Sequence, residues 1–201
     1  MLGGEQSGFI SEIGFEMYQK ILNEALQELR ETEFKTLFDE RTTDNFNGFV
    51  NECVFESDFE VRLPDTYVNN VAERLSLYQA LDNLKTEADL DNFRKELIDR
   101  FGPIPKAGKE LLFSFQLRWL AQELGMERLV VKSGKLVGSF ISNPQSPFYE
   151  TEAFTHLLHR INAMGNGYRL VQKEDKLRLV IEPILHIKDA YEKLMALKGE
   201  D

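Results

Sequence analysis

The residue types that carry out chemistry are sparse in this sequence. Two histidines, His156 and His159, lie three positions apart and would share one face of a helix, but no carboxylate or thiol completes a metal site there. His186 stands alone, and Cys53 is the only cysteine. Because no serine or cysteine occupies a recognisable nucleophile motif, the sequence indicates no catalytic residue, no metal ligand and no cofactor.

The segment 102–110 (GPIPKAGKE) superficially resembles a phosphate-binding loop. Five residues separate Gly102 from Gly108, where the loop requires four, and Glu110 stands where Mg²⁺ requires Ser or Thr. Its two prolines also remove backbone N–H donors that would hold a phosphate. The sequence therefore predicts a turn between two helices.

A charged set on one predicted helix has more specific spacing. Glu96, Asp99 and Arg100 stand at i, i+3 and i+4, so they share a face, while Leu97 and Phe101 point inward. One interpretation is an intrahelical Glu96 to Arg100 pair on a solvated surface, worth about a few tenths of a kcal/mol. The other is a contact surface whose carboxylates meet basic residues of another module.

A glutamine near the N-terminus stands between glycines. Gly4 and Gly8 permit tight turns around Gln6, whose amide can both donate and accept hydrogen bonds. By itself this loop indicates no particular ligand.

Composition limits the possible partners. The 201 residues include 24 Lys and Arg and 34 Asp and Glu, which gives a formal net charge of −10. Affinity for phosphates depends on Lys and Arg, so this balance argues against binding of nucleic acid by the chain alone and favours a basic protein surface. The single cysteine excludes an intrachain disulfide, and no apolar run approaches the roughly 20 residues that span a bilayer. We expect a cytoplasmic protein, and the Gly-rich start without a signal sequence is typical of a fragment of a longer chain.

Hydrophobic periodicity predicts the elements that position these residues. An amphipathic helix is predicted over 9–29, followed by an acidic linker with one strand within 53–61. Asn70 and Thr86 are predicted to cap two helices, the first burying a stripe that includes Val71 and Leu75, and a third begins at Pro105. The remaining predicted elements are a hairpin over 128–141, a helix over 149–164, a hairpin over 168–181 and a helix from Pro183 to Leu197.

This order predicts an α+β fold. The three helices form a cluster, and hairpin, helix, hairpin, helix then form a small antiparallel sheet covered by helices. We divide the chain into residues 1–30, a linker over 31–63 and a C-terminal domain over 64–201.

Three segments together resemble one protein family. Residues 2–10 (LGGEQSGFI) and 13–18 (IGFEMY) resemble the end of the second motor domain of the bacterial transcription-repair coupling factor (Mfd) family. Residues 74–78 (RLSLY) and 96–103 (ELIDRFGP) are similar to segments of its C-terminal domain. The resemblance covers roughly the first 30 residues and 64–130, and the opening loop alone is also similar to the RecG branch-migration translocase.

The resemblance implies a regulatory domain preceded by the tail of a motor domain. The parent would be an ATP-dependent DNA translocase, using ATP and Mg²⁺, that acts on double-stranded DNA, displaces stalled RNA polymerase and recruits UvrA. The C-terminal domain would mask the N-terminal UvrA-binding module through contacts that include Glu96, Asp99 and Arg100. Gln6 would be the glutamine of the translocation motif, which cannot act without its upstream partners.

Two other functions stay open at this stage. The domain could be a docking platform for a separate protein partner, or an accessory nucleic-acid-binding module. The second predicts a basic stripe, and the sequence shows none. An independent enzyme is disfavoured because no nucleophile or metal set is present. The charge of −10 and the acidic helix face favour the interdomain contact.

Overall fold

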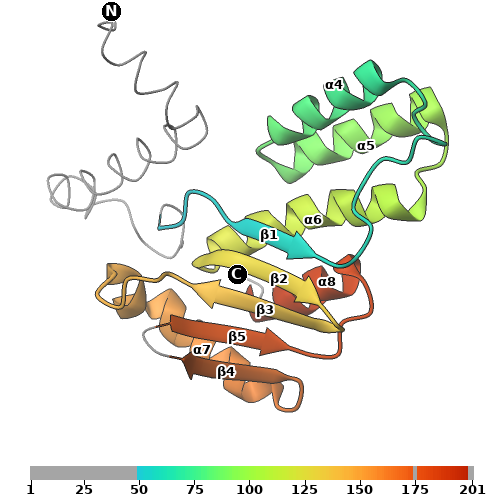
Figure 1. Cartoon of the computed structure of the whole chain (residues 1–201). Helices are drawn as coiled ribbons and strands as arrows, with labels where there is room; N and C mark the ends of the chain where they lie inside the picture. Colours follow the sequence, from blue (N-terminus) through green and yellow to red (C-terminus); the bar gives the residue numbers. More distant parts are fainter. Residues whose placement is uncertain (1–48, 174–175, 199–201) are drawn as a thin grey trace, which may run out of the picture. The chain divides into compact units, whose positions relative to one another are not determined.

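The computed structural model describes residues 49–173 and 176–198 (Figure 1). The chain divides into two compact units, Met1–Asp44 and Asn45–Asp201, and the described residues belong to the second. The predicted helix over 9–29, the residue Gln6 and the linker up to residue 48 lie outside the described residues. Within 49–173 and 176–198, none of the helices combines the length and apolarity that crossing a membrane requires.

Three helices follow one another in the first half of this unit. They are α4 (Val71–Asp82), α5 (Glu87–Phe101) and α6 (Lys106–Glu123). The predicted caps are confirmed, because the side chain of Asn70 accepts a hydrogen bond from the backbone N–H of Glu73, and Thr86 accepts one from Asp89, each at 3.1 Å. Each cap satisfies an N–H group that has no partner inside its own helix.

A first hydrophobic core, the helix core, lies among these three helices. Its buried members are Leu63, Val68, Leu77, Leu81, Leu90, Phe93, Leu97, Ile104, Leu111 and Leu112. The predicted stripe of α4 is wrong at two positions, since Val71 is 69% exposed and Leu75 is 58% exposed. Apolar residues occur on more than one side of α4, so the position of α5 and not the periodicity selects Leu77 and Leu81 for burial.

The second half of the unit contains most of a five-stranded sheet. The strands are β1 (Val54–Ser57), β2 (Met126–Lys132), β3 (Lys135–Phe140), β4 (Tyr168–Lys173) and β5 (Lys176–Ile181), in the order β1-β2-β3-β5-β4. The two predicted hairpins, β2–β3 and β4–β5, are confirmed. The sheet is not purely antiparallel, however, because β1 pairs with β2 in parallel. Helices α4 to α6 form the crossover that a parallel pair requires.

Two further helices complete the fold, α7 (Glu152–Met164) and α8 (Ile187–Lys198), with the short 3₁₀ helix η1 (Pro147–Glu150) before α7. The predicted start of the last helix at Pro183 is wrong by four residues. Ile184 instead lies in the segment between β5 and α8, and its N–H donates to the carbonyl of Gly134 at 2.7 Å. His186 then caps α8, because its Nδ1 accepts from the N–H of Asp189 at 2.9 Å.

A second core, the sheet core, lies between the sheet and helices α6, α7 and α8, which cover the same face in Figure 1. The strands contribute alternate residues to it, as a sheet with one covered face requires. These residues are Leu129 and Val131 of β2, Leu136 and Phe140 of β3, and Leu179 and Ile181 of β5. Gly125 admits the ring of Phe148 into this core, since a Cβ at position 125 would lie 2.1 Å from a ring carbon.

Glu110 is a buried carboxylate with a structural function. It is 8% exposed, and its Oε2 accepts a hydrogen bond from the backbone N–H of Ile187 at 2.7 Å. The N-terminal N–H groups of a helix need such acceptors, and a negative charge is favourable there. Residues 102–105 form the predicted turn between α5 and α6. Residues 106–110 are the start of α6, and from there Glu110 joins α6 to the start of α8.

We expect Glu110→Leu to lower the free energy of unfolding by about 1–3 kcal/mol, because the N–H of Ile187 would be buried without an acceptor. Glu110→Gln keeps an amide oxygen at this position and should lose less. Urea unfolding of the three proteins measures the difference. A Glu110→Leu variant as stable as the wild type would contradict this role.

The reactivity of the Cys53 thiol reports whether the core around it is closed. Cys53 is fully buried, and burial raises the pKa of its thiol to about 12, an effect that the charge of Arg118 only partly offsets. Because the thiolate is the reactive form, we expect native Cys53 to resist iodoacetamide at pH 8 and to react rapidly in denaturant. Mass spectrometry of the alkylated protein tests this, and equal rates in the two states would show that the site opens.

Candidate interdomain contact surface

The predicted charged set lies on the exposed side of α5. Glu96, Asp99 and Arg100 are all exposed, whereas Leu97 is fully buried and Phe101 is half-buried. The helical spacing thus placed each of these side chains on the correct side of the helix. The capping by Thr86 at one end and the turn at Gly102 at the other fix the length of α5 and so the direction of its outer face.

Arg100 is held by two carboxylates from different helices. Its Nη1 lies 2.6 Å from Oε1 of Glu96, as the i, i+4 spacing predicts, and its Nη2 lies 2.5 Å from Oε1 of Glu73 on α4. The guanidinium carbon also stands 4.9 Å from the ring centroid of Phe101. The hydrogen bond to Glu96, and less strongly that to Glu73, raises the pKa of Arg100 above its usual value.

Glu73 was missed as a member of this surface. The sequence predicts Glu73 only in the capping of α4, and no local signal connects it to Arg100, 27 positions away. The pairing of α4 with α5 in the helix core brings the two together. We call Glu73, Glu96, Asp99 and Arg100 the α5 acidic surface.

Asp99 differs from the other members because its carboxylate makes no ion pair or hydrogen bond among residues 49–173 and 176–198. The three carboxylates and one guanidinium of the α5 acidic surface leave a charge of −2. Since Glu96 and Glu73 are already engaged by Arg100, Asp99 is the carboxylate with both oxygens available to an incoming cation. A basic partner would be attracted to this position.

An exposed apolar side chain adjoins these charges. Ile98, beside Asp99 on α5, is 48% exposed. Protein interfaces combine an apolar centre with a polar rim, and Ile98 supplies an apolar element next to the carboxylates. The surface can therefore bind a complementary protein surface, and its residues are not arranged for proton transfer or nucleophilic attack.

The other candidate residues do not assemble into a site. His156 and His159 are both exposed on α7, and no group of three His, Cys, Asp or Glu side chains suited to a metal ion occurs in the described part of the chain. His186 is occupied as the cap of α8. Gln6 lies outside the described residues.

Comparison with known proteins identifies relatives of this chain. A family model, the TRCF domain, matches residues 57–151. The transcription-repair-coupling factor of Haemophilus influenzae is 38% identical over 133 residues, which make up 64% of this chain and 11% of that protein. The Escherichia coli protein of the same name is 36% identical over 132 residues, 64% of this chain and 10% of that protein. The chain therefore spans about a tenth of the length of these curated relatives.

More distant relatives extend the match. The transcription-repair-coupling factor of Staphylococcus epidermidis is 26% identical and covers 100% of this chain but 16% of that protein. A crystal structure of the C-terminal domain of transcription-repair coupling factor matches with a TM-score of 0.61 and 16% identity, over 73% of this chain and 89% of that one. This structure shows that the α+β fold is that of the C-terminal domain.

The exposure of the α5 acidic surface leads to a prediction about stability. Arg100→Ala should lower the free energy of unfolding by no more than about 1 kcal/mol, because exposed ion pairs contribute little. Arg94→Ala, which breaks only an Asp91 pair within the same helix, is the matched control. Urea unfolding compares the two. If Arg100→Ala, but not Arg94→Ala, lowered the free energy of unfolding by more than about 2 kcal/mol, Arg100 would be important for the stability of the fold.

Proposed function

This chain carries the C-terminal domain of the transcription-repair coupling factor family, and we propose that the domain masks the N-terminal UvrA-binding module of the same parent protein. In this proposal the parent is a cytoplasmic, ATP- and Mg²⁺-dependent translocase on double-stranded DNA that displaces stalled RNA polymerase and recruits UvrA. The domain described here contributes no catalysis of its own. Its contribution is to control access to the UvrA-binding module.

The observation that carries the proposal is the arrangement around Arg100. Two carboxylates hold the guanidinium in one orientation, so little side-chain entropy remains to be lost when a partner binds. Asp99 stands beside it without a partner in the described chain and offers both oxygens to a basic residue. This combination suits recognition of a partner with at least one cation facing Asp99.

The same surface is weak enough to release its partner. Exposed charges are screened over about 10 Å at 0.1 M salt, so contacts of this kind contribute modest affinity. Within one chain the tether supplies a high effective concentration, which compensates for weak contacts. Binding of RNA polymerase or DNA elsewhere on the parent would then need to shift the equilibrium by only a few kcal/mol to expose the UvrA-binding module.

The test mixes this chain with the separate N-terminal UvrA-binding module and compares wild type with Glu96→Lys/Asp99→Lys. We expect the double reversal to weaken binding about tenfold or more, because it replaces attraction by repulsion at two adjacent positions. Glu150→Lys/Glu192→Lys makes the same change in net charge at exposed positions on η1 and α8 and should leave binding within about twofold. Isothermal titration calorimetry at two salt concentrations measures both.

Equal affinities for wild type and Glu96→Lys/Asp99→Lys would remove these residues from the contact. A second experiment separates masking from docking of a separate protein. In the full-length parent, the double reversal should increase UvrA binding if the domain is a mask. No increase in UvrA binding, together with weaker binding in trans, would favour a docking platform.

A further inference from the structure

The face of the sheet opposite the helices carries no helix of the described chain (Figure 1). Strand register places alternate residues of all five strands on it. We call this set the open sheet face. Its members are Val54, Glu56, Arg128, Val130, Lys132, Lys135, Val137, Ser139, Arg169, Val171, Lys173, Lys176, Arg178 and Val180.

The open sheet face is basic although the chain is acidic. Seven of its fourteen residues are Lys or Arg and one, Glu56, is a carboxylate, with Glu182 adjacent at the end of β5. The sequence shows no basic stripe because these seven residues are distributed over four strands and alternate with core residues. The absence of a stripe in the sequence was thus misleading, and pairing of the strands gathers the cations on one face.

An apolar row crosses the centre of this face. Val130, Val137 and Val180 stand directly opposite one another on β2, β3 and β5, and all three are half-buried. Neighbouring strands are about 4.8 Å apart, so the row spans about 10 Å. This row ends at Glu56 on β1 and at Arg169 on β4. Val54 and Val171, which are 52% and 41% exposed, lie in the neighbouring row, opposite Arg128 and Arg178. We call Val130, Val137 and Val180 the valine row.

Cations flank the valine row on both sides. Arg128, Ser139 and Arg178 form the adjacent row on one side, and Lys132 and Lys135 face each other on the other side. An apolar stripe between two lines of positive charge is complementary to a stripe of apolar residues between two lines of carboxylates.

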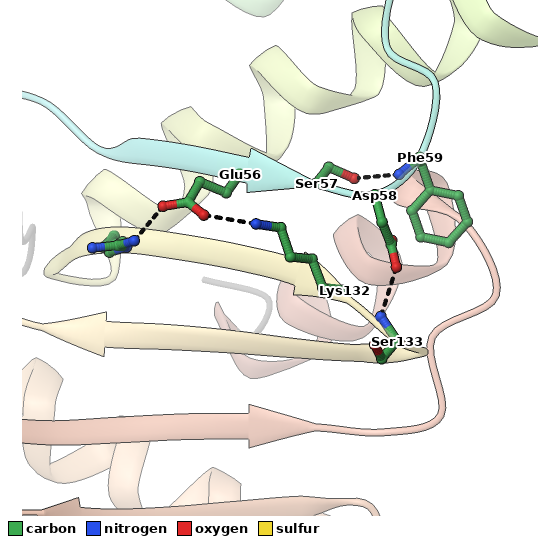
Figure 2. A network of polar contacts seen from close by, with 7 residues as sticks. Glu56, Ser57, Asp58, Phe59, Lys132 and Ser133 are labelled. Carbon is green, nitrogen blue, oxygen red and sulfur yellow. Dashed lines mark hydrogen bonds and ion pairs between the residues drawn. The ribbon is translucent and has the colours of Figure 1, made fainter.

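Two carboxylates form ion pairs with some of these cations. Glu56 binds Lys132 at 2.8 Å (Figure 2) and also binds Arg128. These contacts, with the hydrogen bond from Lys132 foremost, lower the pKa of Glu56. Glu182 binds Lys135 at 2.7 Å and Arg169 at 2.5 Å. These pairs leave oxygens and donors exposed at the rim, where charges set specificity more than affinity.

Arg178 has no such partner. It makes no ion pair or hydrogen bond within residues 49–173 and 176–198, and its Nε is buried without an acceptor. The two Nη atoms of Arg178 are not among the buried atoms, so a ligand carboxylate can pair with them and supply a partner for this guanidinium. Arg178 lies on β5, an interior strand between β3 and β4, one row from Val137 and Val180 on the open sheet face.

The composition of this face favours a protein over a nucleic acid. None of its fourteen residues is aromatic, so it has no platform on which bases could stack. Glu56 and Glu182 would repel phosphates, and a valine row has no counterpart on a phosphate backbone. An apolar centre with a charged rim is instead the anatomy of a protein interface.

We propose that the open sheet face binds an acidic amphipathic helix of a protein partner. Two turns of α-helix rise about 10.8 Å, which matches the valine row, so apolar residues at i, i+3 or i+4 and i+7 would rest on the three valines. Carboxylates on one flank of that helix meet Arg178 and Arg128, and those on the other flank meet Lys132 and Lys135. This surface is separate from the α5 acidic surface and does not depend on the masking function.

The test uses a synthetic 18-residue helix with leucines at those spacings and glutamates on both flanks. We expect it to bind the whole chain and to shift the NMR signals of Val130, Val137 and Val180 selectively. The same helix with lysines in place of the glutamates should bind at least about tenfold more weakly, because every flanking contact becomes repulsive. A 20-base-pair DNA duplex, measured at the same salt, is the nucleic-acid probe.

Variants separate the charge from the apolar contact. Arg178→Gln should weaken the acidic helix about tenfold, and Val137→Thr, which keeps the side-chain shape, should weaken it severalfold. Lys188→Gln on α8, which removes one positive charge as Arg178→Gln does, is the matched control and should leave affinity unchanged. Circular dichroism confirms that each variant is folded. Tighter binding of the DNA duplex than of the acidic helix would overturn the proposal, as would NMR shifts confined to residues outside the open sheet face, or unchanged affinity for Arg178→Gln.

Discussion

The structure depends on the burial of α6 in two hydrophobic cores. Leu111 and Leu112, near its start, lie in the helix core, whereas Leu117 and Leu120, nearer its end, lie in the sheet core. An 18-residue helix is about 27 Å long, so it reaches both cores as one rigid element. Because Glu110 ties the same helix to α8, the position of the α5 acidic surface relative to the sheet is set by packing and not by a linker.

Local signals predicted the elements, and long-range pairing decided what they expose. The caps Asn70 and Thr86 and both hairpins depend on residues within a few positions of one another, and the structure confirms them. The exposure of Leu75, the parallel pairing of β1 and the contact between Arg100 and Glu73 depend on elements far apart in the sequence. The hydrophobic periodicity of a helix or strand does not show which other helix or strand it packs against.

Of the two candidate surfaces, one could be predicted from local spacing and the other could not, because it depends on long-range strand pairing. Helical spacing alone placed Glu96, Asp99 and Arg100 on one exposed face, because all three belong to a single helix. The open sheet face could not be found in that way, since its seven cations come from four strands whose order is not the sequence order. The net charge of −10 therefore does not show that the chain has an acidic surface on α5 and a basic surface on the sheet. Each of these surfaces can attract a partner of opposite charge.

The parallel pairing of β1 also affects the order of folding. Val54 pairs with Arg128, 128 − 54 = 74 positions later, whereas the partners in each hairpin are close in sequence. On a ribosome β1 emerges first and has no strand partner until α4, α5, α6 and β2 have been made, so local hairpins form before the edge is complete. Only four residues long and bearing Glu56, β1 is a poor template for pairing with other chains during this interval. The same carboxylate that makes β1 unsuited to pairing with other chains pairs with Arg128 and Lys132 in the finished fold.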